Sequence, residues 1–394
     1  MRILISGAGI AGPTLAYWLD RYGFKPTIVE EAPHLRTGGY LIDFWGAGFD
    51  IAERMGLLPQ IRSKGYMLRE VKVVNRNGDR VAGFPVDAFF RVTHGRYVSL
   101  PRRELSASIF GQIEDNVETI FGDSVAHIEE RHRDVRVAFK RGGERDFDLV
   151  VGADGLHSRV RELAYGDDSK FEKYLGFKVA AFEVEGYQPR DEPAYTMYTE
   201  VGQQVGRFSL RNNRTMFHFT FADADADCPE NVPDQKALLQ QRFGNGGWEC
   251  PQILDALDSA SEFYFDRVSQ IRMDGQPGSW SRGRITLIGD AAFCVSLLAG
   301  QGSALAMVSA YILAGELHRS NGDYAEAFRR YQNLFGPLAR KKQKAALGFA
   351  GAFAPKSKFA LFLRNQIFNL LAIPWFADLT AGRGLADKIE MPDY

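Results

Sequence analysis

Apolar runs and glycine-rich breaks divide the first 34 residues into a strand, a turn, a helix and a second strand. Residues 3–5 form an apolar run that is typical of a buried parallel strand. In the next segment Leu15, Leu19 and Tyr22 recur at helical spacing, which predicts a helix. A second strand is predicted over residues 26–29. The chain therefore opens like an α/β fold.

Two later apolar runs, 149–151 and 285–288, have the same buried-strand character. Between them, residues 176–222 alternate apolar and polar positions and break at Gly, Pro or Asn, which predicts an antiparallel sheet. Asn77-Gly78 between two strand-like runs indicates a hairpin. Residues 117–148 are predicted to form a meander of short strands.

The run TMFHFTF places two different sets of side chains on the two faces of one predicted strand. Met216, His218 and Thr220 share one face, and the phenylalanines at 217, 219 and 221 share the other. We expect one face to pack under helices and the other to cover a cavity. The pattern leaves open which face does which.

Near the C-terminal end, residues 323–346 are predicted to be helical and basic, which indicates a solvated helix face. Residues 359–379 are apolar and aromatic and long enough to span a bilayer. Arg364, Asn369 and Pro374 interrupt this segment, so we predict an amphipathic helix rather than a membrane span. A peripheral membrane contact remains an alternative.

Composition excludes several classes of protein. The 394 residues are 45% hydrophobic and 25% charged, which is typical of a soluble globular protein. With 48 Lys and Arg against 49 Asp and Glu, the charge gives no support for nucleic-acid binding. The three cysteines have no CxxC spacing, which argues against a metal site and a disulfide framework and fits a cytoplasmic location. The N-terminus lacks a signal-peptide pattern.

The first turn carries the strongest chemical signal. Gly7, Gly9 and Gly12 form GxGxxG between the first strand and the first helix, and Glu30 follows 18 residues later at the end of the second strand. Glycines allow a tight turn and close approach of a pyrophosphate to the helix N-terminus, and the acid can accept hydrogen bonds from a ribose. The motif predicts dinucleotide binding without distinguishing NAD from FAD.

Three further motifs favour a flavin. Asp154-Gly155 follows the strand at 149–151, and Gly289-Asp290 follows the strand at 285–288. A loop with Gly300 and Gly302 then leads into a helix of small residues. Arg102 stands at R-x-x-L spacing before Leu105. No Ser-His-Asp or Cys-His pattern is apparent, so no catalytic base is assigned.

Together these motifs resemble the single-component class A flavin monooxygenases typified by p-hydroxybenzoate hydroxylase. The resemblance implies a mixed α/β (α+β) fold, with a Rossmann-like FAD-binding domain, an interleaved antiparallel-sheet substrate domain and C-terminal helices. The expected parts are 1–67, 100–170 and 275–330 for FAD, 68–99 and 171–274 for substrate, and 331–394 for the C-terminal extension.

The resemblance also implies the FAD contacts. They are Gly7, Gly9, Ala11, Gly12, Glu30, Glu31, Gly39, Arg102, Asp154, Gly155, Gly289, Asp290, Gly300, Gly302 and Ser303. NADPH or NADH would reduce FAD, and a flavin C4a-hydroperoxide formed with O2 would hydroxylate the substrate. The residues leave open a flavin oxidase or dehydrogenase and a flavoprotein that only sequesters a ligand.

A narrower resemblance points to the substrate. The stretch GGYLIDFWGAGFDIAERMGL (38–57), the phrase IAGPTLAYWL and the C-terminal extension resemble the tetracycline-inactivating branch. This implies a polycyclic phenolic or enolic substrate, such as a tetracycline or another polyketide, bound by a monomer or homodimer. Candidate substrate contacts are Phe44, Tyr198, Arg207 and His218, with Tyr40 and Trp45 beside the flavin. Each has a packing or surface role as its alternative.

The segment after Asp290 departs from the family pattern. Phe293 replaces a frequent histidine, and Leu297 stands near the expected proline. Ala304 and Ser309 replace the usual Asn and Asp of the following helix. We expect packing beside the isoalloxazine to differ, and we interpret Phe293 as core filler.

Overall fold

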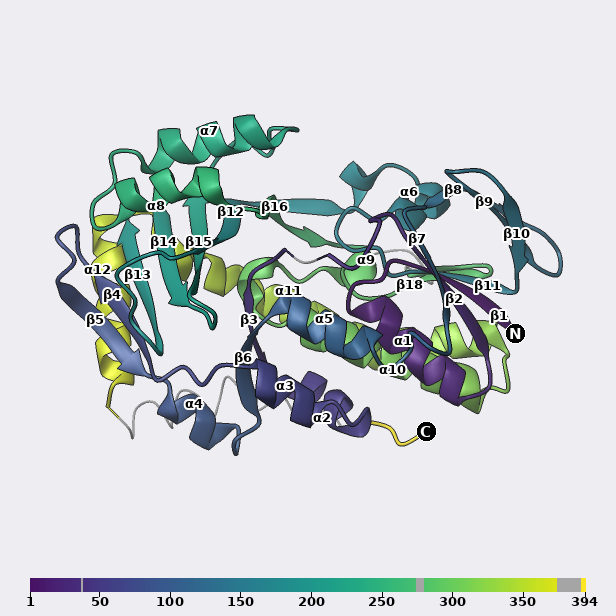
Figure 1. Cartoon of the computed structure of the whole chain (residues 1–394). Helices are drawn as coiled ribbons and strands as arrows, with labels where there is room; N and C mark the ends of the chain where they lie inside the picture. The colour runs from purple at the N-terminus through teal and green to yellow at the C-terminus, as the bar shows by residue number, and fades with distance from the viewer. Residues whose placement is uncertain (37, 274–279, 374–390) are drawn as a thin grey trace.

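The computed structural model describes residues 1–36, 38–273, 280–373 and 391–394. Figure 1 shows two sheets, one toward each end of the molecule, with long helices between and behind them. This arrangement confirms the expected mixed helix and sheet fold. The division into cofactor and substrate domains stays a prediction.

The sheet near the N-terminus has six strands in the order β17-β18-β11-β1-β2-β7. All neighbours run parallel except β17 and β18. The central strands are mostly buried and mostly apolar because helices cover both faces of such a sheet. The strands are β1 (Arg2–Ser6), β2 (Lys25–Glu30), β7 (Glu118–Phe121), β11 (Leu149–Gly152), β17 (Ser281–Arg282) and β18 (Ile285–Leu287).

Helices around this sheet build the larger core. α1 (Ala11–Arg21) packs along α10 (Gly302–Arg319), and α10 packs on α11 (Tyr324–Phe353). Shorter helices complete this part of the molecule: α2 (Ala47–Arg54), α3 (Leu58–Lys64), α5 (Arg102–Phe110), α6 (Arg159–Tyr165) and α9 (Asp290–Phe293). Helix α4 (Asp87–Val92) lies below the other sheet in Figure 1.

The predicted meander over 117–148 is wrong at its start. β7 is the parallel edge strand of the six-stranded sheet, where Ile28 pairs with Thr119. Only β8 (Val125–Glu130), β9 (Val135–Phe139) and β10 (Glu144–Phe147) form an antiparallel sheet of their own. A four-residue strand carries no pattern that distinguishes a parallel partner far away from an antiparallel neighbour.

The second sheet has seven strands in the order β16-β12-β15-β14-β13-β4-β5. Its neighbours are antiparallel apart from β13 and β4, so the antiparallel prediction for 176–222 is confirmed. The predicted hairpin joins β4 and β5, with Gly78 at φ +89°. The strands are β4 (Glu70–Val74), β5 (Arg80–Pro85), β12 (Glu172–Glu185), β13 (Ala194–Glu200), β14 (Gln203–Ser209), β15 (Arg214–Ala222) and β16 (Phe263–Ile271).

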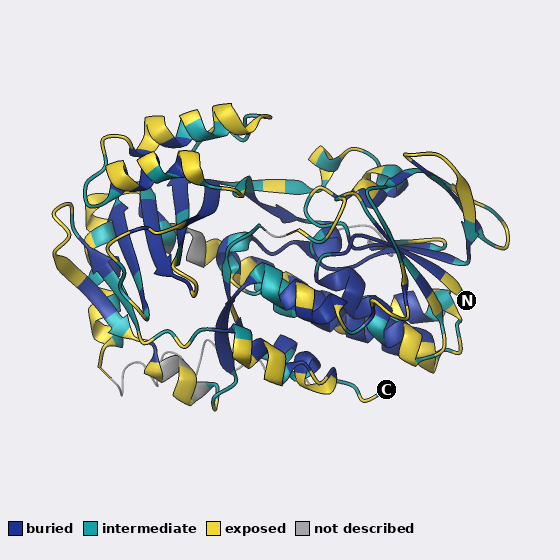
Figure 2. Ribbon diagram, in the orientation of Figure 1, coloured by how far each residue is buried: buried dark blue, intermediate teal, exposed yellow. Residues whose placement is uncertain are grey.

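One face of this sheet lies under α7 (Val232–Phe243) and α8 (Cys250–Ala256), as Figure 2 shows by the dark strands below two half-exposed helices. Phe217, Phe219 and Phe221 belong to the core between them, where Phe219 and Phe221 meet the ring of Phe243. The phenylalanine face of the strand is therefore the helix-covered face. The face with His218 points the other way.

A two-stranded sheet, β3 (Leu41–Trp45) with β6 (Tyr97–Pro101), lies between the two larger sheets (Figure 1). Helix α12 (Lys358–Leu371) packs on β5, and the segment 391–394 returns to α10. There a Cβ on Gly315 would lie 2.1 Å from the Tyr394 ring. In the described part of the chain, no helix combines the length and apolar character needed to cross a bilayer. Residues 374–379 of the predicted amphipathic helix lie outside the described residues.

Candidate active site

The turn between β1 and α1 needs glycine for packing at two positions and for access at a third. Gly7 has φ +107°, and a Cβ there would lie 2.6 Å from the carbonyl oxygen of Ala153. A Cβ on Gly12 would lie 2.0 Å from the carbonyl oxygen of Gly7. A Cβ on Gly9 would come no closer than 3.5 Å, to the Arg102 guanidinium. Gly9 therefore keeps the backbone open to a ligand.

Helix α1 begins directly after this turn with an uncapped N-terminus. No side-chain bond from Ile10 satisfies its first N–H groups. These donors and the positive end of the helix dipole favour an anion such as a pyrophosphate. Ala11 also touches the Gly289-Asp290 motif, since a Cβ on Gly289 would lie 3.1 Å from the Ala11 Cβ. The first and last motifs of the sequence thus meet at this helix end.

Glu30 folds back over the glycine turn. Its Oε2 accepts a hydrogen bond from the Ala8 N–H at 2.7 Å, and its Oε1 accepts one from the Ala32 N–H at 3.0 Å. These bonds fix the carboxylate beside the turn, where it can accept hydrogen bonds from a ribose. Glu31 lies elsewhere, because its side chain is 65% exposed and pairs with Lys140 at the surface.

The start of α5 brings Arg102 to the same place. The Arg102 N–H donates to the Tyr40 carbonyl oxygen at 3.0 Å, and a Cβ on Gly39 would lie 3.8 Å from the Arg102 Cβ. One turn later, the Ser106 hydroxyl donates to the Gly9 carbonyl oxygen at 3.0 Å. The arginine is thereby positioned next to the glycine turn, where its charge can face a phosphate.

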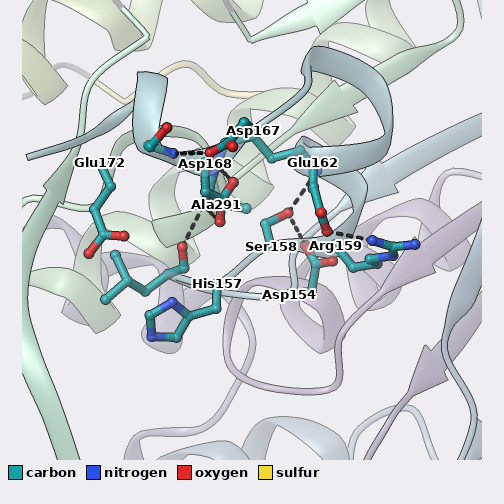
Figure 3. Close-up of polar contacts among 12 residues, drawn as sticks. Asp154, His157, Ser158, Arg159, Glu162, Asp167, Asp168, Glu172 and Ala291 are labelled. Carbon is teal, nitrogen blue, oxygen red and sulfur yellow. Dashed lines mark hydrogen bonds and ion pairs between the residues drawn. The ribbon is translucent and has the colours of Figure 1, made fainter. Parts of the chain in front are cut away.

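Asp154 closes the carboxyl end of β11. Its carboxylate accepts hydrogen bonds from the Ser158 hydroxyl at 2.5 Å and the Val160 N–H at 3.1 Å, and it lies 3.3 Å from the Ser6 hydroxyl (Figure 3). Burial raises the pKa of this carboxyl, although the hydrogen bonds oppose the rise. Gly155 follows with φ +83°. The motif is a rigid buried turn between β11 and α6.

Arg161 was not predicted as a site residue, and it ties two motifs together. Its guanidinium is completely buried and binds both oxygens of Asp168, at 2.9 and 2.8 Å. It also donates to the carbonyl oxygens of Leu156 at 2.6 Å and Ala291 at 2.9 Å. The guanidinium therefore links the loop after Asp154 to the helix that begins at Asp290, and Figure 3 labels its partners Asp168 and Ala291. An arginine in sequence gives no sign of such burial.

Asp290 begins α9 and faces the start of α10. A Cβ on Gly302 would lie 3.7 Å from Asp290 Oδ1. Burial raises the pKa of Asp290, and the nearby charge of Arg102 opposes that rise. Gly300 has the left-handed conformation that turns the chain into α10. Helix α10 has no side-chain cap either, so the N–H groups of its first turn, which includes Ser303, are available to a ligand.

These segments form a cradle that fits FAD. Two uncapped helix starts, an arginine and three desolvated carboxylates converge from six separate parts of the chain. Glu30 suits the adenosine ribose, Arg102 and the α1 N-terminus suit the pyrophosphate, and Asp290 with the α10 N-terminus suits the flavin side. Of the predicted FAD contacts, only Glu31 lies away from this group. The described residues contain no cluster of His, Cys, Asp or Glu that could hold a metal ion.

The departures from the family pattern are accommodated by packing. Phe293 is buried among the rings of Trp280 and Phe335, as expected for core filler. The Gln343 amide of α11 donates to the carbonyl oxygens of Ile271 at 2.6 Å and Phe293 at 3.2 Å, which holds the loop after α9. Gln343 was missed because its contacts join distant elements.

Leu297, Ala304 and Ser309 are also explained by their neighbours. Leu297 packs against an apolar cluster with Phe177 and Val179. Ala304 leaves space for close approach of Gly48, whose Cβ would lie 2.5 Å from it. The Ser309 hydroxyl accepts a hydrogen bond from the Gly289 N–H at 3.3 Å, so it supports the turn before Asp290.

Two of the four candidate substrate residues lie on the helix-covered face of the seven-stranded sheet. Tyr198 belongs to the apolar core under α8 and accepts a hydrogen bond from the Gly247 N–H at 3.1 Å. Arg207 is 5% exposed and pairs with Glu249 at 3.3 Å. Both side chains are therefore buried on the helix-covered face, and the structure does not bring them near His218.

His218 lies on the opposite face and retains partial solvent access. Burial lowers its pKa to about 4, so the ring is neutral at neutral pH. Across the sheet it is in register with Ala181 and Gly206, and Ala181 is in register with Tyr264.

The same face turns toward the cofactor cradle. The rings of Tyr264 and Tyr40 lie 5.5 Å apart, and Tyr40 is the residue that bonds Arg102. His218 therefore stands in the row of the sheet that leads to the cradle. Phe44, in contrast, is 1% exposed and packs beside Phe49 in the core of the N-terminal part. Phe44 therefore has the packing environment that was the alternative to a substrate contact.

Comparisons with known proteins agree with this construction. The sequence pattern of a family described as FAD binding domain matches residues 1–326. An uncharacterized protein of Mycobacterium tuberculosis is 38% identical over 86% of this chain and 91% of its own length. A flavin-dependent monooxygenase of an unknown prokaryotic organism is 33% identical over 100% of this chain and 99% of its own length.

Among solved structures, the tetracycline destructase Tet(51) superposes with a TM-score of 0.84 at 30% identity, covering 100% of this chain and 99% of that one. The expected family is thus confirmed by sequence and by fold. The chain is an oxidoreductase that belongs to the FAD-dependent monooxygenases of the class A hydroxylase type, together with the tetracycline destructases.

Proposed function

We propose that the protein uses NADPH or NADH and O2 to hydroxylate a polycyclic phenolic or enolic compound. In balance, substrate, O2, NAD(P)H and a proton give hydroxylated substrate, water and NAD(P)+. The redox chemistry that carries electrons from the nicotinamide to O2 would be supplied by FAD when bound, and one oxygen atom of O2 would enter the substrate. The observation that carries the proposal is the orientation of the His218 face, which looks from the substrate sheet toward the cofactor cradle.

Within this proposal the chain's own residues position the reactants and exclude water. Arg102, Glu30 and Asp290 would hold the cofactor, while Arg161 and Gln343 fix the backbone around it. His218, uncharged at neutral pH, can donate or accept a hydrogen bond without introducing a charge beside an electron-rich ring. We no longer propose Phe44, Tyr198 or Arg207 as substrate contacts, because their side chains are engaged in packing. A tetracycline is one member of the proposed substrate class.

The test is oxidation of NADPH and NADH by the FAD-loaded protein, with tetracyclines and other phenolic polyketides added one at a time. We expect stimulated oxidation and a product heavier by one oxygen atom that derives from labelled O2. Stimulated oxidation without oxygen in any product would show an oxidase or uncoupled turnover and would overturn the proposal. Tight binding with no consumption of nicotinamide would indicate a ligand-sequestering flavoprotein instead.

A further inference from the structure

Strand β3 has one face in the core of the N-terminal part and one face directed away from it. Ile42 and Phe44 are buried in that core, together with Leu100 of β6. Asp43 lies on the opposite face, where it is in register with Ser99. Asp43 is exposed, on the face of the two-stranded β3–β6 sheet that is turned away from this core.

One oxygen of the Asp43 carboxylate accepts two hydrogen bonds, and the other accepts none from the described residues. The Tyr97 hydroxyl donates to Oδ1 at 2.7 Å, and the Ser99 hydroxyl donates to the same Oδ1 at 2.5 Å. Tyr97 and Ser99 are themselves buried. Among the described residues, no hydrogen bond or ion pair ends on Oδ2. The two hydroxyls therefore fix the direction of a carboxylate whose second oxygen remains free to accept a hydrogen bond.

The wall opposite Asp43 is the His218 face of the seven-stranded sheet. Leu41, on the same face of β3 as Asp43, packs in one cluster with Tyr195, Phe208 and Met216. Burial raises the pKa of Tyr195, and the charge of Asp43 adds to the rise. A Cβ on Gly206 would collide with the Tyr195 ring, so this ring lies over Gly206, in register with His218.

Other charged groups around this space already have partners. On the sheet, Glu183 pairs with both Arg103 and Arg214. The Lys342 ammonium of α11 lies 5.9 Å from the ring centroid of Trp45 in β3, and burial lowers the pKa of Lys342 to about 8. His218 carries no charge at neutral pH. Asp43 therefore presents an acceptor oxygen on the face of β3 that is turned toward Tyr195 and the His218 face of the seven-stranded sheet.

We propose that Asp43 is a substrate-recognition residue whose Oδ2 accepts a hydrogen bond from an O–H or N–H donor of the bound polycyclic compound. This rests on the proposed function, because it places the ligand between β3 and the His218 face. It narrows the substrate class to neutral or cationic ring systems that carry a free hydroxyl or an ammonium at that edge. Ring systems that present a carboxylate there are excluded by charge repulsion and by the lack of a donor.

The test measures binding rather than turnover. The FAD-loaded protein is titrated with a dihydroxyanthraquinone that has free hydroxyls, with its dimethyl ether, and with an anthraquinone carboxylate, using the flavin fluorescence as the signal. The wild type is expected to bind the hydroxyl compound about tenfold or more tightly than the ether. Asp43→Asn is expected to lose most of this preference, since the amide keeps Oδ1 for Tyr97 and Ser99 but turns Oδ2 into a donor. The same variant should bind the carboxylate more tightly.

Two further variants separate recognition from folding. Asp20→Asn changes an exposed acid on α1 and should leave all three affinities unchanged. Ser99→Ala keeps the Asp43 charge but removes one of its two hydroxyl donors, so it should weaken the hydroxyl preference by a smaller factor. Equal FAD content and flavin spectra in all variants show that the cradle is intact.

The possible outcomes distinguish this proposal from the proposed function. A hydroxyl preference that survives in Asp43→Asn would overturn the role of Asp43, even if the wild type hydroxylates a polyketide. A wild type that binds none of these compounds, or binds hydroxyl and ether equally, would also overturn it. Hydroxylation is judged separately, by oxygen incorporation across the broader panel.

Discussion

The guanidinium of Arg161 donates a hydrogen bond of 2.9 Å to the carbonyl oxygen of Ala291, a residue 130 positions away. This contact joins α6, which follows the Asp154 motif, to α9, which begins at Asp290. Both motifs are predicted to contact FAD, and the buried Arg161 guanidinium fixes the position of one relative to the other. The pair Arg161 and Asp168 satisfies that cation, with side chains 0% and 28% exposed.

Replacing Arg161 should therefore damage stability and cofactor binding together. Arg161→Leu leaves Asp168 and two carbonyl oxygens without their donor, and we expect a loss of about 3 to 5 kcal/mol in the free energy of unfolding. Urea unfolding and the FAD content of the purified protein measure both effects. Arg159→Leu is the matched control, because Arg159 is 46% exposed and pairs only with Glu162 among the described residues. Equal stability of the two variants would contradict the role given to Arg161.

Alanine substitutions at Gly9 and Gly12 should impair different properties, FAD binding in the first case and apoprotein stability in the second. Gly12→Ala places a Cβ 2.0 Å from a backbone oxygen, so we expect apoprotein stability to fall by about 1 to 3 kcal/mol. Gly9→Ala meets no protein atom closer than 3.5 Å and should fold normally but bind FAD much more weakly. Thermal unfolding of the apoproteins and FAD titration distinguish the two. A Gly9→Ala protein with unchanged FAD affinity would place the pyrophosphate elsewhere.

His218 should make the protein less stable at mildly acidic pH. Its pKa is about 4 in the folded protein against 6.5 for the ordinary side chain, so the unfolded chain binds the proton more readily below about pH 6.5. The stabilising effect of the neutral ring is present above that pH and is lost as pH falls toward 4. Between about pH 6.5 and 5 the loss should reach roughly 2 kcal/mol. Denaturant unfolding at both pH values measures it.

The variant His218→Gln should show a smaller fall over the same pH interval. Asp154 and Asp290 have raised pKa values and change stability in the opposite direction, so the difference between wild type and variant isolates the histidine. If the two proteins lose stability in parallel, His218 is not the buried neutral group described here.

Substitutions on the two faces of the seven-stranded sheet should have different effects, one on stability and the other on substrate binding. Arg207→Gln breaks a largely buried pair with Glu249 and should lower the free energy of unfolding by about 3 kcal/mol or more, without changing KM. His218→Gln should raise KM at neutral pH and cost less stability. Steady-state kinetics with a substrate identified in the oxygen-incorporation assay, together with unfolding curves, provide the comparison. A raised KM for Arg207→Gln would indicate that Arg207 contacts the substrate after all.

By itself the sequence determined the cofactor chemistry and the alternation within each strand. Glycine turns, an acid at a strand end and an uncapped helix start are local features, and local chain chemistry alone decides what they can bind. The two side-chain sets of residues 216–221 likewise follow from the two-residue period of a strand. These predictions needed no knowledge of distant contacts.

Tertiary structure alone decided which face of each strand packs into a core and which side chains support the predicted cofactor motifs. Phe44 and Asp43 are neighbours in β3, yet Phe44 lies in a core and Asp43 lies on the face turned toward the seven-stranded sheet. Only the elements that pack on β3 determine which of its two faces is buried. The sequence shows that Arg207 is positively charged but not that its side chain is buried. The structure pairs it with Glu249, which lies 42 positions away at the start of α8. The roles of Arg161 and Gln343 could not be predicted for the same reason. A hydrogen bond between distant segments does not change the periodicity or the composition of either segment.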